Sequence, residues 1–111
     1  MKETQRGHFE WGFGDLPGKA LDAHRAFFDR HLDPVRKALE EPRCQSFTIA
    51  LAPANHEHDA WRSALAADLA REYAPKLVNV AAGPKTRAFD ELLEYLEDAP
   101  GVTGQYLQAH E

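Results

Sequence analysis

The sequence has almost no cysteine. Cys44 is the single one among 111 residues, so an intramolecular disulfide is impossible and a zinc site built from several cysteines is excluded. The lack of a disulfide framework fits a reducing compartment. Arg43 precedes Cys44, but no histidine lies near it in the sequence to activate the thiol, so we expect a loop cysteine without a role.

Long apolar runs and clusters of basic residues are also missing. No stretch approaches the about 18 consecutive apolar residues of a membrane helix, and the opening residues MKETQRGHFEW contain no apolar secretory segment. The net charge is −5, whereas nucleic-acid binding relies on clustered Lys and Arg. We therefore expect a cytoplasmic protein whose partners are neither a membrane nor nucleic acid.

The residues that are present are typical of one globular domain. Hydrophobic residues make up 43% and charged residues 28% of the chain, which fits a single domain over residues 1–111. The polar residues 1–7 are expected to be disordered, as chain termini often are.

Apolar periodicity predicts helices separated by short strands. Apolar side chains recur three or four residues apart from Lys19 to Glu41, which predicts a long helix. Pro34 lacks a backbone donor, so we expect a kink near residues 32–33, with Asp33 capping the second part. The other expected elements are helices over 60–74 and 87–96 and strands over 8–12, 46–52, 77–82 and 105–110.

This alternation predicts an α/β fold in three layers, with a small parallel sheet of three or four strands flanked by helices. Segments 46–52 and 77–82 are apolar on both faces, as strands covered on both sides by helices are. We expect these two strands to be parallel neighbours at the centre of the sheet.

Short motifs in the second half point to a family. The helix end LAREYAP leads into the strand LVNVAAG, and Thr103-Gly104-Gln105 precedes the last strand. These motifs resemble the C-terminal half of short-chain dehydrogenases/reductases, over roughly residues 20–108. The resemblance implies a degenerate, Rossmann-like half domain. The residues that match the first motif are Leu69, Ala70, Glu72, Ala74, Pro75, Val78, Asn79 and Gly83.

The resemblance also implies which positions would carry the family's catalytic residues, and this chain has other residue types at those positions. In the family a Tyr transfers the proton, a Lys four residues later lowers the pKa of that Tyr, and a Ser polarises the carbonyl. The corresponding Tyr and Lys positions are Asn55 and Asp59, and the loop APANHEHD contains no hydroxyl. Pro17 replaces the third glycine of a dinucleotide-binding turn. We expect no dehydrogenase catalysis and no cofactor.

Two loops keep a ligand-binding alternative open. The loop at 55–59 offers two imidazoles, but two ligands do not make a metal site, so no metal is predicted. The loop at 83–86 follows a strand at the end where parallel sheets bind ligands, and a small anion would suit it. The alternative function is a small-ligand-binding or enzymatic module, completed by a partner chain. Its candidate residues are Asn55, His56, His58, Gly83, Lys85 and Thr86.

The helix over 60–74 carries two stripes. Trp61, Leu65, Leu69 and Tyr73 form one stripe, and alanines form the other. In the resembled family this helix and the kinked one before it form a dimer contact, so we expect a homodimer through helices 19–41 and 60–74. The alternative is that the kinked helix of the same chain covers the alanines. The expected interface residues are Ala60, Ala64, Ala67, Phe27, Phe28 and Trp61.

The function that the sequence favours is a non-catalytic, dehydrogenase-like scaffold or interaction protein that associates with itself. No motif identifies a pathway or a particular ligand.

Overall fold

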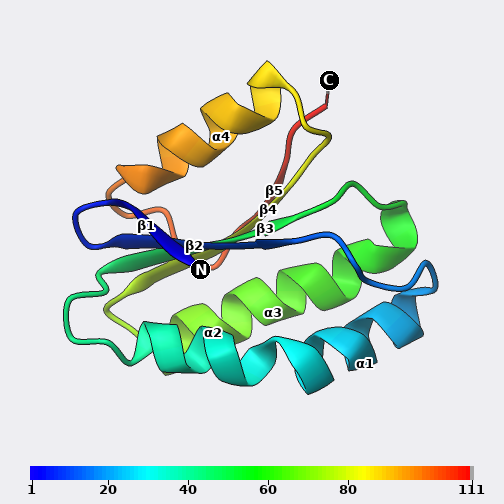
Figure 1. Ribbon diagram of the computed structural model, residues 1–111, viewed down its shortest axis with the longest axis horizontal. Coiled ribbons are helices and arrows are strands. Elements are labelled where there is room, and N and C mark those ends of the chain that lie inside the picture. The colour runs from blue at the N-terminus through cyan, green and yellow to red at the C-terminus, as the bar shows by residue number, and fades with distance from the viewer. Residues whose placement is uncertain (111) are drawn as a thin grey trace.

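The computed structural model describes residues 1–110, apart from the side chain of Phe13. Figure 1 shows three layers, in which α4 covers one face of the sheet and α1, α2 and α3 cover the other. The predicted three-layer α/β fold is therefore confirmed. The elements are β1 (Lys2–Gln5), β2 (His8–Phe13), α1 (Ala20–Arg30), α2 (Leu32–Leu39), β3 (Ser46–Leu51), the 3₁₀ helix η1 (His56–His58), α3 (Asp59–Glu72), β4 (Leu77–Ala82), α4 (Arg87–Glu97) and β5 (Tyr106–Gln108).

The sheet has the strand order β1-β2-β3-β4-β5. Strands β2 to β5 are parallel, and the central pair β3 and β4 runs in register, with Thr48 opposite Asn79. The predicted parallel pairing of these two strands is confirmed. Strands β3 and β4 are almost entirely buried. This burial explains why they are apolar on both faces, because helices cover both faces of the sheet.

The N-terminal residues form a strand, where disorder was expected. Lys2–Gln5 pairs antiparallel with β2, and Gly7 adopts φ 81° in the turn between the two strands. The side chains of β1 are largely exposed, so its polarity gave no strand signal. Backbone hydrogen bonds to the edge of β2 hold it, and charged side chains are common on such edge strands.

The long helix is broken where the sequence predicted a kink. α1 ends at Arg30, α2 begins at Leu32, and His31 lies between them. Pro34 is in the first turn of α2, where its missing N–H would have no intrahelical partner. Asp33 was expected to cap this helix, but it lies in the first turn and the helix has no side-chain cap.

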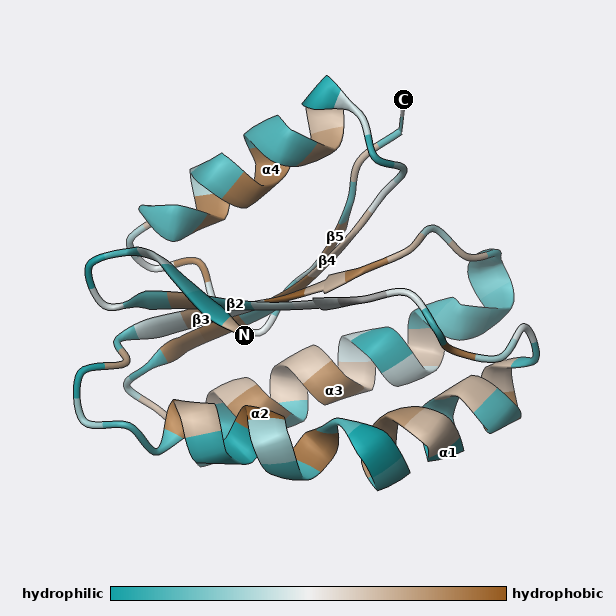
Figure 2. Cartoon of the chain, viewed as in Figure 1, coloured by the Kyte–Doolittle hydropathy of each residue, from teal (hydrophilic) through white to brown (hydrophobic). Residues whose placement is uncertain are grey.

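The main core lies between the sheet and helices α1, α2 and α3. Phe27, Leu39, Phe47 and Ile49 are fully buried there. A smaller core joins α4 to the other face, and Figure 2 shows the hydrophobic side of α4 turned toward the sheet. Within residues 1–110, none of the helices is long and apolar enough to cross a membrane.

Candidate ligand-binding site

Two hollows lie at the carboxyl end of the parallel strands, where parallel sheets bind ligands. The smaller one is a pocket of about 230 Å³ beside the start of α3, here called the Arg62 pocket. The larger one is a cleft of about 920 Å³ beside α4, here called the α4 cleft. Gly14, Ala52 and Pro53 line both, so the two hollows adjoin.

Two loops and the start of α3 form the Arg62 pocket. The loop after β2 contributes Leu16 and Pro17, and the loop after β3 contributes residues 52–55. Asn55, His58 and Arg62 bring polar side chains to its wall. The structure thus joins two of the predicted ligand residues, Asn55 and His58, to an arginine that sequence reasoning did not select.

His58 holds the pocket together. The residue is 3% exposed, and its Nε2–H donates to the carbonyl oxygen of Gly18 at 2.9 Å. Nδ1 accepts a hydrogen bond from the indole N–H of Trp61 at 3.1 Å. Both ring nitrogens are engaged, so His58 ties α3 to the loop after β2. His56 is exposed and does not line the pocket.

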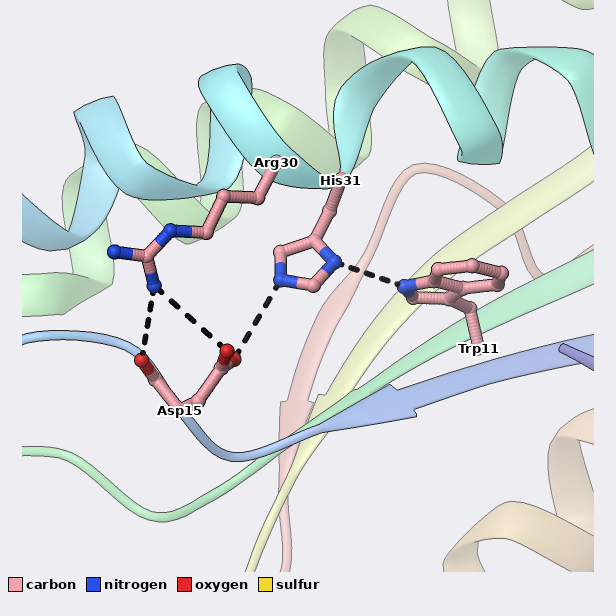
Figure 3. Close-up of polar contacts among 4 residues, drawn as sticks. All are labelled: Trp11, Asp15, Arg30 and His31. Carbon is pink, nitrogen blue, oxygen red and sulfur yellow. Dashed lines mark hydrogen bonds and ion pairs between the residues drawn. The ribbon is translucent and has the colours of Figure 1, made fainter.

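A second cluster fixes the other part of this loop (Figure 3). The indole N–H of Trp11 on β2 donates to Nδ1 of His31, 3.3 Å away. Nε2 of His31 lies 3.5 Å from the carboxylate of Asp15, and Arg30 pairs with the same carboxylate at 3.7 Å. Because His31 lies at the break between α1 and α2, the helix break positions the loop that walls the pocket.

The positions of the expected proton-transfer pair have local structural roles. Asn55 Oδ1 accepts a hydrogen bond from the backbone N–H of Glu57 at 2.9 Å, which caps η1. Asp59 is the first residue of α3, where a carboxylate is favourable at the positive end of the helix dipole. Neither side chain is suited to lower the pKa of a phenol.

Arg62 is 4% exposed and is the only charged residue among those that line the pocket in the described chain. The sequence did contain a signal for it. Ala66 and Leu69, four and seven residues later, lie on the same helix face and are buried. An arginine on a buried helix face calls for a specific explanation, since charged residues are rarely buried without a partner.

The loop at 83–86 lies apart from the loop at 55–59. Gly83 and Lys85 line the α4 cleft, whereas Asn55 and His58 line the Arg62 pocket. Thr86 lines neither hollow. Its hydroxyl oxygen accepts a hydrogen bond from the backbone N–H of Phe89 at 3.4 Å, which caps α4.

The charges of the α4 cleft are mixed. Lys2 and Lys85 line it together with Glu10 and Asp90. Burial raises the pKa of Glu10, and Lys2 partly offsets this increase. Lysines and acids together make this cleft less selective for an anion than the Arg62 pocket, which has a cation alone.

The described residues offer neither a metal centre nor a reactive thiol. Residues 1–110 contain no group of three or more His, Cys, Asp or Glu side chains placed to hold a metal ion. Cys44 lies in the loop before β3, as we expected, but it is 1% exposed and belongs to the main core. Burial raises the pKa of its thiol, which disfavours the reactive thiolate.

The structure divides the expected interface residues into two groups. Phe27 and Trp61 are buried within the chain, with 0% and 6% of their surface exposed. Phe28 is 47% exposed, and Ala60 and Ala64 are also exposed. Ala67 is half-buried.

A protein-family model described as SDR-like, short chain dehydrogenase-like protein, matches residues 12–109. The chain belongs to this short-chain dehydrogenase-like family. The match spans most of the chain, from near the end of β2 to the residue after β5, and confirms the resemblance that the motifs indicated. No curated protein and no solved structure matched the chain.

The motifs that pointed to the short-chain dehydrogenase-like family join the last two strands. Asn79 is 3% exposed, its amide N–H donates to the carbonyl of Val102, and its Oδ1 accepts from the N–H of Gln105, each at 3.0 Å. The hydroxyl of Thr103 accepts from the N–H of Val78 at 3.0 Å. Gly104 has φ 73°. These residues therefore preserve the scaffold, independently of any reaction.

Proposed function

We propose that this chain is a non-catalytic dehydrogenase-like scaffold that associates with a second copy of itself. The observation that carries the proposal is the exposure of two large apolar side chains on one stripe of α1, Leu21 and Phe28, which together with the exposed Ala60 and Ala64 on α3 are here called the apolar patch. Leu21 is 85% exposed and Phe28 is 47% exposed. Exposed large apolar side chains that gather in one place are typical of interaction sites.

The two helices of the patch are connected through aromatic rings. The imidazole of His24 stacks on Trp61 with centroids 5.4 Å apart, and it meets the ring of Phe28 edge-on at 4.8 Å. Trp61 is the helical neighbour of Ala60 and Ala64. His24 and Trp61 therefore link the side of α1 that carries Phe28 to α3.

A second copy fits this patch better than an unrelated partner because the patch is self-complementary. Leu21 and Phe28 are seven residues apart, two helical turns on one stripe. A two-fold axis between them places Leu21 of each copy on Phe28 of the other. Asp22 and Arg25 flank this stripe on the same side, so the axis also brings Arg25 of each copy toward Asp22 of the other.

The remainder of the alanine stripe is used inside the chain. A side chain at Gly104 would lie 3.5 Å from Cβ of Ala70 and 3.9 Å from Cα of Ala67. The turn before β5 therefore packs close to these two alanines. The sequence had suggested that the kinked helix of the same chain covers the alanine stripe. The proposed interface is centred on Leu21 and Phe28 and buries about 800 Å² per copy.

Light scattering on a size-exclusion column at tens of micromolar tests the association. We expect a mass near twice the 12.5 kDa of the chain. Leu21→Glu/Phe28→Glu should shift the mass to that of one chain. Tyr95→Glu is the matched control, because Tyr95 is 56% exposed on α4, on the opposite face of the sheet. A wild-type mass near 12.5 kDa contradicts the proposal.

A charge exchange tests the orientation of the two copies. Arg25→Asp alone should weaken the dimer, and Asp22→Arg/Arg25→Asp should restore it. Equal dimer stability in the single and the double variant would rule out the two-fold arrangement while leaving association itself intact.

A further inference from the structure

Arg62 is a buried cation without an acidic partner. Its Nη1 donates to the carbonyl of Ala52 at 3.0 Å and to the hydroxyl of Tyr106 at 3.2 Å. In the described chain no carboxylate forms an ion pair with it. Removal of a charge from water is costly unless a partner compensates for it, and a guanidinium cannot escape that cost by losing its proton.

Both hydrogen bonds of Arg62 are donated by the same guanidinium nitrogen, Nη1. Nε is buried and has no hydrogen-bond partner within residues 1–110. Nη2 also has no hydrogen bond there. The guanidinium therefore has donors that the hydrogen bonds to Ala52 and Tyr106 leave unused, and a guanidinium is well suited to bind a carboxylate.

Two aromatic rings and two loops surround the guanidinium of Arg62. The guanidinium carbon lies 5.5 Å from the ring centroid of Trp61 and 5.9 Å from that of Tyr106. Figure 1 shows the loops after β2 and β3 at the same end of the sheet as the start of α3. One of these loops is tied to His58, and the other supplies the carbonyl of Ala52.

The pocket wall indicates the kind of anion. No carboxylate lines the pocket in the described chain, Leu16 and Pro17 give it an apolar side, and Asn55 adds an amide. Its volume of about 230 Å³ is below the roughly 300–1,000 Å³ of pockets for drug-sized ligands. A phosphate carries more charge than one guanidinium balances. One cation beside an apolar wall suits a small organic monocarboxylate.

We propose that the Arg62 pocket binds a small aliphatic carboxylate, with the guanidinium of Arg62 balancing its charge and Leu16 and Pro17 contacting the carbon chain. This binding does not depend on self-association, because the pocket lies at the carboxyl end of the sheet and none of its lining residues belongs to the apolar patch.

Titration with sodium butyrate, followed by the ¹⁵N–¹H resonance of Arg62 Nε, tests the proposal. We expect a saturable shift with butyrate and none with butyramide, which has nearly the same shape but no charge. Inorganic phosphate should bind at least about tenfold more weakly. Absence of a shift with butyrate, or tighter binding of phosphate than of butyrate, would overturn the carboxylate site.

Three variants locate the site, with butyrate affinity measured by calorimetry. Arg62→Gln should weaken binding by about tenfold or more, as expected for the loss of hydrogen bonds to a charged group. Arg71→Gln is the matched control on the exposed side of α3, and it should bind like the wild type. Ala54→Trp fills the pocket and should abolish binding while Arg62 stays in place. Wild-type affinity in Arg62→Gln or in Ala54→Trp would refute the site.

Discussion

His8 has the most enclosed imidazole of the described chain, at 2% exposure on β2. Nδ1 lies 2.5 Å from the hydroxyl of Ser46, and Nε2 lies 3.2 Å from that of Thr48. Burial lowers the pKa of His8 below 6.5, and the negative charge of Glu97 partly offsets this decrease. The folded protein therefore favours neutral His8, whereas the unfolded chain takes up the proton at the ordinary pKa.

The stability of the fold should accordingly fall as the pH falls below 6.5. In that window the unfolded chain binds more protons than the folded one, so the free energy of unfolding decreases until the pH reaches the folded pKa. Urea unfolding at about pH 7 and about pH 5.5 measures this loss. His8→Gln retains hydrogen-bonding groups and does not titrate, so its loss should be smaller.

The comparison of the wild type with His8→Gln removes the contributions that other titrating groups make to the pH dependence. Glu10 has a raised pKa, so its contribution has the opposite direction and is present in both. An equal pH dependence in the wild type and in His8→Gln would show that His8 is not responsible.

At the scale of elements, the packing of α4 on the sheet depends on Gly83. A Cβ added at this position would lie 3.0 Å from the ring of Phe89 and 3.1 Å from Cβ of Ala109. Such contacts are tighter than side chains normally make, so α4 and the chain after β5 would have to move. Gly83 was a candidate ligand residue in the sequence, and the structure gives it this packing role as well.

Gly83→Ala should lower the free energy of unfolding by about 1–3 kcal/mol, as overpacking of a core does. Gly18→Ala is the matched control, because a Cβ there would meet nothing within 4 Å. Chemical denaturation of both variants checks this difference. If the two variants are equally stable, close packing is not the reason for the glycine.

At the scale of the whole molecule, the sheet shows how this chain differs from a complete dinucleotide-binding fold. β1 pairs antiparallel with β2 and occupies the edge at which a further parallel strand would join. A partner chain could extend the sheet beside β2 only by displacing β1. The loop between β2 and α1 contains Gly14 and Gly18, but Pro17 stands where a dinucleotide-binding turn has its third glycine.

We therefore predict that NADH and NADPH show no saturable binding to the protein by titration calorimetry. Asn55→Tyr/Asp59→Lys introduces the family's Tyr and Lys at these positions, and this variant should still not oxidise NADPH with carbonyl substrates, because Pro17 disrupts the dinucleotide-binding pattern of glycines. Micromolar affinity of the wild type for either dinucleotide would contradict the prediction.

The sequence by itself determined the strands and helices that depend on local patterns. Ser46–Leu51 and Leu77–Ala82 were recognisable because apolar residues occupy both of their faces, and α3 because it lacks glycine and proline. Pro34 marked the helix break, since the missing N–H acts within one turn. The sequence alone also indicated that the family's chemistry is absent, because Asn55 and Asp59 occupy the Tyr and Lys positions and this inference needs only the identities of the residues.

Only the tertiary structure decided the roles of β1, Cys44 and Arg62. β1 is polar and forms because the edge of β2 offers backbone partners, which no local pattern records. Cys44 becomes a core residue because α2 and β3 meet around the turn that carries it. Arg62 becomes a buried cation because two loops, distant in sequence, close over the start of α3. Periodicity is a property of neighbours along the chain, whereas the environment of a side chain is set by segments that meet only after folding.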